Sequence, residues 1–342
     1  MERPDLSKAD AEIRAYIEYL EERLAARKNV STTAQPEKAA QPDFHEPPTT
    51  KQVITISKSG IAKRTARHLY PRQRRGGMGI FDLDTREDDP PVLAAQADEK
   101  DALLLFSSRG RAFRIPAAAL ESGAVRSKGS SLVRRLGLEP DEYLAAALPV
   151  AAEGYINLLS ERGMVRTFRH HLFGEHMQNG AEFLRTSEFG PLVAACRAAD
   201  QADLFIATRN GMAIRFERKL VPLQGGSAIR LADGDRAAAI TAATQDSRVF
   251  LLGADGKGTV RLMSGFAANK SPGGGGKIAM KTGELAAAFT APFGVDIFII
   301  TRLGKMIRFA ASEVPATEGV VQGVNCAALR ADQVVTAMAA AP

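Results

Sequence analysis

The sequence predicts an all-β protein, a six-bladed β-propeller of four-stranded blades, preceded by one helix and a flexible linker. From about residue 51 onward, a unit of about 48 residues recurs six times, each time with an apolar run, a Gly-containing turn and a basic residue followed by more β-forming residues. Such a unit is too small to bury its own apolar face, and its length is typical of a propeller blade. The Gly and β signals argue against a helical solenoid.

The N-terminal region, residues 1–28, is predicted to form an amphipathic helix. Ser7 and Asp10 make a capping signal, and one face carries the apolar residues Ile13, Ile17, Leu20 and Leu24. Residues 29–50, rich in Pro, Ala, Gln and Thr, are predicted to be a disordered linker. The helix either packs on its own protein or mediates self-association or docking to a partner, and about three heptads do not decide between these roles.

The six hairpin turns define the repeat. Their glycines, separated by 50, 53, 48, 45 and 48 residues, are Gly60, Gly110, Gly163, Gly211, Gly256 and Gly304. Each stands where a tight hairpin needs positive φ. The predicted blades within 51–342 are about 51–98, 99–152, 153–200, 201–245, 246–292 and 293–342. Either a closed ring or a spiral is compatible with this repeat.

A second Gly-rich polar loop follows each hairpin and precedes a further apolar strand. These loops lie at 72–79, 122–131, 177–182, 223–228, 271–277 and 318–325. The spacing again supports six equivalent units.

Charge is distributed unevenly along the chain. Residues 1–50 contain 7 basic and 10 acidic side chains, so the other 292 residues hold 38 of the 45 basic and 29 of the 39 acidic ones, a surplus of nine positive charges. A surplus of this size attracts nucleic acid, an acidic membrane or an acidic partner alike. No apolar stretch has the length of a membrane span and the N-terminus lacks a signal peptide, which predicts a cytoplasmic protein without membrane contact.

No catalytic, metal or cofactor site is predicted. Cys196 and Cys326 are far apart and are expected in the core. His170, His171 and His176 lie near Glu175, but adjacent side chains in a strand point to opposite faces. The run 271–277 imitates a phosphate-binding P-loop, yet it begins with Ser instead of Gly and is followed by Ile instead of Ser or Thr.

The seven residues Gln73 to Gly79, Gln-Arg-Arg-Gly-Gly-Met-Gly, resemble the box that marks the C-terminal domain of DNA gyrase A. The flanking SKSGIAKRT and LLLFSSRGRAFRIP segments, and 299–324 near the C-terminus, resemble the blades of that family. The resemblance covers about residues 52–340. Met78 departs from the pattern, because the family has a cation at this position.

The resemblance implies a propeller of the β-pinwheel type, with a basic rim around which duplex DNA wraps. In that family the box loop links the first and last blades and is needed for chiral wrapping. The related component of topoisomerase IV, whose domain lacks an intact box, is a model for weaker wrapping. The DNA-cleaving tyrosine region of gyrase A has no counterpart here, so we expect a non-enzymatic, nucleoid-associated protein that assists a topoisomerase core on separate chains or acts in chromosome architecture.

The candidate DNA-binding residues are the box and the cations that flank the hairpins. If successive blades present the same outer strand, these cations form an arc that holds phosphates without reading sequence. The candidates are Lys63, Arg64, Arg72, Gln73, Arg74, Arg75, Gly76, Gly77, Gly79, Arg111, Arg114, Arg126, Lys128, Arg166, Arg169, Arg215, Lys257, Arg261, Lys277, Lys305 and Arg308.

Three other interpretations remain open from the sequence. The hairpin cations could be solvated charges that protect strand edges. The chain could be a protein-interaction propeller that has lost DNA wrapping, which Met78, the acidic stretch 82–89 and the weakly basic stretch 226–235 favour. An enzyme that uses the central channel would need a polar cluster there, and the sequence offers none.

Overall fold

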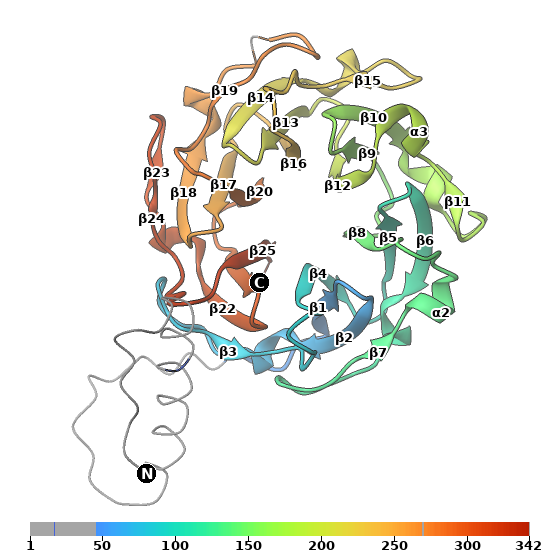
Figure 1. The fold of residues 1–342 in the computed structure, drawn as a ribbon, viewed down its shortest axis with the longest axis vertical. Coiled ribbons are helices and arrows are strands. Elements are labelled where there is room, and N and C mark those ends of the chain that lie inside the picture. Colours follow the sequence, from blue (N-terminus) through green and yellow to red (C-terminus); the bar gives the residue numbers. More distant parts are fainter. Residues whose placement is uncertain (1–16, 18–45, 269, 342) are drawn as a thin grey trace, which may run out of the picture.

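Six β-sheets stand like blades around a central axis in the computed structural model, which describes residues 17, 46–268 and 270–341 (Figure 1). The predicted six-bladed propeller is therefore confirmed. The predicted helix at 1–28, except for residue 17, and the predicted linker up to residue 45 lie outside the described residues.

Each blade is built from an inner strand, two middle strands that form a hairpin, and a short outer strand. In this order, blade 1 has β4 (Pro91–Asp98), β1 (Lys51–Ser57), β2 (Ile61–Ala66) and β7 (Ser130–Ser131), and blade 2 has β8 (Leu144–Pro149), β5 (Ala102–Ser107), β6 (Arg111–Pro116) and β11 (Ala181–Glu182). Blade 3 has β12 (Leu192–Ala198), β9 (Tyr155–Ser160), β10 (Met164–Arg169) and β15 (Gly226–Ser227).

The second half of the ring repeats this order. Blade 4 has β16 (Ala237–Ala243), β13 (Asp203–Thr208), β14 (Met212–Glu217) and β19 (Lys277–Ile278), and blade 6 has β25 (Val334–Ala340), β21 (Asp296–Thr301), β22 (Lys305–Ala310) and β3 (Ile80–Phe81). Blade 5 has β20 (Leu285–Thr290), β17 (Arg248–Gly253) and β18 (Lys257–Leu262), whose outer edge pairs with both β23 (Ala316–Thr317) and β24 (Val324–Asn325).

The outer strand of every blade comes from the following sequence repeat. After its hairpin, the chain crosses to the edge of the preceding blade, runs through the second Gly-rich loop, and returns as the inner strand of its own blade. A sequence period fixes the number of repeats but not this exchange of strands. The six hairpin glycines all have positive φ, between 75° and 85°, as expected.

Short helices occupy the crossings. Each hairpin ends in a 3-10 helix, namely η1 (Arg67–Leu69), η2 (Ala117–Ala119), η3 (His170–Phe173), η4 (Arg218–Leu220), η5 (Met263–Gly265) and η6 (Ala311–Glu313). Two four-residue helices, α2 (Val133–Leu136) and α3 (Thr186–Phe189), follow outer strands. Among the described residues, no helix has both the length and the apolar character needed to cross a membrane.

The hydrophobic core lies between the blades. Residues of β21, for example, are buried on both faces of the sheet, because a neighbouring blade covers each face. Six apolar clusters fill the six gaps between consecutive blades. The inner strands are rich in Ala, as in Ala237–Ala243, and these small side chains let neighbouring inner strands pack against one another around the axis.

The ring is closed, and the closing seam joins repeat 1 to repeat 6. Strand β3 pairs antiparallel with β22, and β25 packs against β4. The apolar cluster at this seam has seven buried residues among those described, compared with fifteen between blades 5 and 6. Polar contacts therefore contribute a larger share of the interactions at this seam than at the seam between blades 5 and 6.

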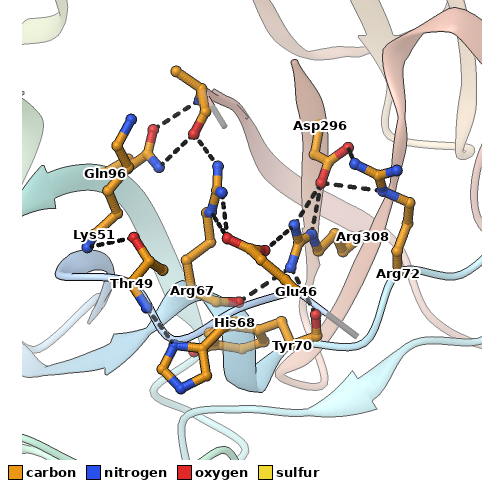
Figure 2. A network of polar contacts seen from close by, with 11 residues as sticks. Glu46, Thr49, Lys51, Arg67, His68, Tyr70, Arg72, Gln96, Asp296 and Arg308 are labelled. Carbon is orange, nitrogen blue, oxygen red and sulfur yellow. Dashed lines mark hydrogen bonds and ion pairs between the residues drawn. The ribbon is translucent and has the colours of Figure 1, made fainter. Parts of the chain in front are cut away.

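Figure 2 shows the polar network at the closing seam. The carboxylate of Glu46, which precedes the first blade, accepts hydrogen bonds from Arg67 of blade 1 (Nε, 2.9 Å) and from Arg308 of blade 6 (Nη2, 2.5 Å). Arg67 also donates to the carbonyl of Ala341. The side-chain amide of Gln96 binds both backbone groups of Ala341, at 3.0 and 2.8 Å.

The side chain of Glu46 is only 9% exposed, and its two arginine partners stabilise its negative charge. Burial raises its pKa, but the hydrogen bonds and positive charges of Arg308 and Arg67 outweigh burial, so that its pKa falls below the usual 4.5. A carboxyl group whose pKa is lower in the folded state stabilises the fold above its unfolded pKa. This contribution is lost as the pH falls through the folded pKa, so it disappears at pH values below 4.5.

We predict that Glu46→Gln lowers the free energy of unfolding at neutral pH by about 1–3 kcal/mol, because the buried Arg67 loses its carboxylate partner and Arg308 keeps only Asp296. Urea unfolding measured from neutral to acidic pH should show a smaller loss of stability in the variant than in the wild type. Glu87→Gln, at an exposed carboxylate, is the control and should follow the wild-type curve. Identical pH profiles for the wild type and Glu46→Gln would contradict this role.

Candidate nucleic-acid interface

The cations that follow the hairpin turns lie between blades, because they belong to the third of four strands. Side chains alternate along such a strand, so each faces either the following or the preceding blade. The side chains that face the following blade are Arg64, Arg114, Arg215 and Arg308, and those that face the preceding blade are Lys63, Arg166 and Arg261.

Arg215 and Arg308 make the same clasp in two different seams. Arg215 pairs with Asp203 at 2.8 Å and donates to the carbonyls of Met263 and Phe266 in the next repeat. Arg308 pairs with Asp296 at 2.7 Å and donates to the carbonyls of Arg67 and Tyr70. Both side chains are at most 3% exposed. They stabilise the contact between blades and cannot reach a phosphate in this geometry.

Lys63 anchors the segment that carries the box. It is completely buried, and its ammonium pairs with Asp82 at 2.9 Å and donates to the carbonyls of Asp82 and Ala124. The Asp82 carboxylate also accepts hydrogen bonds from Thr55 and Tyr70, both at 2.7 Å. Burial, together with the nearby charge of Asp82, raises the pKa of Tyr70 well above 10. Asp82 therefore ties the end of β3 to blade 1.

The expectation that the hairpin cations form an exposed arc is thus not met by Lys63, Arg215, Arg261 and Arg308, which are all at most 5% exposed. The physical reason is the strand exchange. The outer strand of the next repeat covers the edge that the sequence suggested would face solvent.

The other candidates are partly buried. Arg64 binds the carbonyl of Leu120 and pairs with Glu99, Arg72 pairs with Asp296, and Arg111 pairs with Glu142. The hydrogen bonds that Arg111 donates to Glu142, partly opposed by burial, raise the pKa of Arg111. The remaining members of this group are Gln73, Gly76, Gly77, Gly79, Arg114, Arg166, Lys257, Lys277 and Lys305. Most of these cations serve ion pairs or carbonyl contacts, so their charge is only partly available to a ligand.

The box loop is fixed to repeat 6 by its backbone. Gln73 N–H donates to the carbonyl of Arg308 at 2.7 Å, Gly76 N–H to that of Cys326 at 2.9 Å, and Gly77 accepts from the N–H of Ala328 at 3.0 Å. These bonds place the loop across the closing seam. The inference that the box links the first and last blades agrees with this geometry.

Two glycines of the box leave room for close contacts within the loop and with blade 6. A Cβ on Gly77 would lie 2.3 Å from Oε1 of Gln73, the atom that accepts a hydrogen bond from Gly79 N–H. Gly79 has a φ of 72°, and a Cβ there would lie 2.7 Å from Ile307. The glycines therefore allow the loop to lie flat on blade 6 while Gln73 spans it.

Five of the predicted residues have exposed side chains: Arg74, Arg75, Arg126, Lys128 and Arg169. The first four lie on neighbouring rim segments. The box loop continues into β3, and the segment after β3 is joined to the loop before β7 by a hydrogen bond of 2.9 Å from the N–H of Asp84 to the carbonyl of Ser127. Arg126 lies 5.7 Å from the ring of Phe81 in β3. Arg169, by contrast, lines a separate depression in blade 3 with Arg197 and Asp200.

Sequence reasoning missed two further cations on this rim. Arg134 and Arg135 are exposed on α2, directly after β7. The signal that would have found them is their place just after a second Gly-rich loop, since that loop forms the outer edge. Other exposed rim cations follow the same rule, namely Arg185, Arg230 and Lys281, and the exposed Lys270 lies just before such a loop. Between them lie the exposed acidic residues Glu175, Glu182 and Glu318.

The sequence had also drawn attention to histidines and cysteines. His170 contacts the carbonyl of Gly154, and His171 is exposed. In the described part of the chain, no three His, Cys, Asp or Glu side chains gather as metal ligands would. Cys196 and Cys326 are buried, and burial raises the pKa of each thiol to about 12.

We predict that Lys63→Met lowers the free energy of unfolding by about 3–5 kcal/mol, because it leaves the buried Asp82 carboxylate without its cation. Lys128→Met, at an exposed lysine on the adjoining loop, should change stability by less than about 0.5 kcal/mol. Urea denaturation of both variants measures the difference. Equal stability of the two would mean that Lys63 does not anchor the box segment.

The sequence of this chain matches the family model of the DNA gyrase C-terminal domain, β-propeller, at residues 51–89, 101–151, 202–243 and 296–320. It is 27% identical over 301 residues to DNA gyrase A of Staphylococcus aureus and 25% identical over 287 residues to that of Mycolicibacterium smegmatis. These matches cover 84% and 80% of this chain, but the chain spans only about a third, 34%, of either relative.

Solved structures agree on the fold. The DNA gyrase A C-terminal domain superposes with a TM-score of 0.74 at 20% identity, over 84% of this chain and 99% of that one. The C-terminal domain of DNA topoisomerase IV superposes with a TM-score of 0.61 at 16% identity, over 84% and 93% of the two chains. With the repeat, the box and the closed ring of six blades, these matches show that the chain is similar in sequence to the DNA gyrase C-terminal domain and has the same β-propeller fold.

Proposed function

We propose that this protein binds and bends duplex DNA on its rim without reading sequence, and that it performs no chemistry itself. The observation that supports the proposal is a row of exposed cations on the rim segments that run from the closing seam along blade 1 to its seam with blade 2 (Figure 1). They are Arg74, Arg75, Arg126, Lys128, Arg134 and Arg135. Cations on a rigid curved edge fit a phosphate backbone, and each further contact helps to offset the cost of bending the duplex.

The box supplies two unlike arginines to this surface. Arg75 is partly committed, because its Nη1 donates to the carbonyl of Asn325 at 3.1 Å. Among the described residues, the side chain of Arg74 has no hydrogen-bond partner and is exposed. Met78, which is 53% exposed, offers no charge where the family has a cation. We infer a phosphate contact for Arg74 above all, and weaker chiral wrapping than an intact box would give.

The proposal also covers the location of the protein in the cell and its partners. A DNA-bending propeller of this family would act in the cytoplasm on the nucleoid, with a topoisomerase core on separate chains as one candidate partner. Residues 1–28, if helical, would provide the docking or self-association segment.

A protein-interaction propeller is the second candidate. It is favoured by the exposed acidic side chains Asp84, Glu87 and Asp88, which follow directly after β3 and would repel a duplex on that face. A gel-shift assay separates the two candidates, because a rim that bends DNA binds a longer duplex more tightly than a short one. Equal weak binding of both duplexes would favour the interaction module.

We predict that the affinity for duplex DNA falls with salt at a log–log slope near −0.9 for each phosphate contacted. Six contacts would weaken binding by about 10³-fold between 50 and 200 mM salt. Fluorescence anisotropy with labelled duplex measures the slope. A flat response to salt would contradict rim binding.

We further predict that Arg74→Glu combined with Arg75→Glu makes this slope shallower by about 1.8, since two contacts are lost. The pair should also reduce the topological change of plasmid relaxed in the presence of the protein more than it reduces binding. The control is Arg302→Glu, at an exposed arginine in the hairpin turn of blade 6, outside the box and the second Gly-rich loops. If Arg302→Glu has the same effect as one box substitution, net charge alone explains the binding.

A further inference from the structure

Blade 5 departs from the repeat at Arg261. Five residues after the turn glycine, four of the other five repeats place an apolar side chain in the seam with the preceding blade, as at Ile115, Phe216 and Phe309, and repeat 1 has the uncharged Thr65. Arg261 occupies the equivalent position, is 5% exposed, and its Nε and Nη1 have no hydrogen-bond partner. A buried guanidinium without a partner is costly, so its presence requires an explanation.

The neighbours of Arg261 are other cations. The guanidinium of Arg261 lies 5.7 Å, and the ammonium of Lys277 4.2 Å, from the centre of the Phe266 ring. Burial lowers the pKa of Arg261. Burial also lowers the pKa of Lys277, and the charges of Arg261, Lys270 and Arg215 add to that effect. Three other positive groups from blades 4 and 5 therefore lie close enough to Lys277 to disfavour its charge.

The carboxylates at this seam do not neutralise Arg261 and Lys277. Asp203 is engaged by Arg215 at 2.8 Å. Glu318 attracts Arg261 only at a distance, because its carboxylate is exposed and accepts a hydrogen bond from Ser264 at 2.7 Å. At the closing seam, by contrast, Arg308 has two carboxylates, those of Asp296 and Glu46. The seam between blades 4 and 5 thus lacks the anion that the closing seam contains.

We propose that the seam between blades 4 and 5 is a phosphate-binding site, formed by Arg261 and Lys277 with Lys270 at its edge. The planar guanidinium of Arg261 and the ammonium of Lys277 would both donate to the oxygens of one tetrahedral anion. The partly exposed Lys277 and the exposed Lys270 give a ligand access from the rim. The anion is either a DNA phosphodiester or a free phosphate. In the first case the site deepens the proposed DNA function, and in the second it is independent of it.

Inorganic phosphate tests the site without DNA. The melting temperature of the full chain should rise with phosphate in a saturable way, relative to chloride and acetate at equal ionic strength. An absent or unsaturable rise, or an equal rise with acetate, would overturn the proposal. This measurement on the wild type stays decisive even if a variant fails to fold.

Substitutions identify the residues involved. Arg261→Met should weaken phosphate binding by at least about tenfold. Without phosphate, the variant should melt no lower than the wild type, because an unpaired buried cation is replaced by an apolar side chain. Lys277→Met should weaken phosphate binding about fivefold. Lys281→Met, at an exposed lysine four residues further along, is the control and should bind phosphate like the wild type. Full phosphate binding by Arg261→Met would overturn the proposal.

A final arm distinguishes the two sources of phosphate. If the ligand is a DNA phosphodiester, Arg261→Met lowers the affinity for duplex and inorganic phosphate competes with DNA. If it is a free phosphate, Arg261→Met binds duplex like the wild type. Either result supports the site when the phosphate titration is positive. A protein that binds phosphate but shows no salt-dependent DNA binding would refute only the proposed function.

Discussion

The pairing of β3 with β22 is the contact on which the arrangement depends, because it closes a ring in which no blade is complete by itself. Each sheet receives its outer strand from the next repeat, and blade 6 can obtain one only from repeat 1. The segment that crosses this seam carries the box. The loop with the closely packed glycines and the exposed Arg74 and Arg75 therefore lies where the two ends of the propeller meet, held at one end by Asp82 and at the other by the backbone of blade 6.

The sequence allowed the fold to be predicted because the fold is a repeat. Turn glycines at a near-constant spacing and six apolar hairpins determine the class, the number of blades and the positive φ at positions such as Gly211. The strand exchange could not be predicted, since a period is the same whether the outer strand belongs to its own blade or to its neighbour. Because of this ambiguity, Lys63 and Arg215 were expected at the outer edge, whereas they are buried in the seams between blades.

The contacts across the closing seam were hidden for a different reason. Glu46 lies in a stretch whose composition indicates a linker, and its partner Arg308 is 262 residues away. No local pattern connects them, and only the closed ring brings them together. The exposed cations on α2, such as Arg134, do have a local signal, namely their place after a second Gly-rich loop. The signal predicts exposed cations only once the second Gly-rich loop is known to form the rim.

Because the six seams share one scaffold, a side chain that breaks the pattern is informative. Arg215 and Arg308 show what a buried arginine in a seam requires: a carboxylate from its own blade and carbonyls from the next repeat. Arg261 occupies an apolar position and has neither. Structural needs alone would favour an apolar residue there, as in repeats 2, 3, 4 and 6, since a buried ion gains nothing over a well-packed apolar side chain unless it is compensated. The cost of keeping a cation at this position is best explained by a ligand that supplies the missing negative charge.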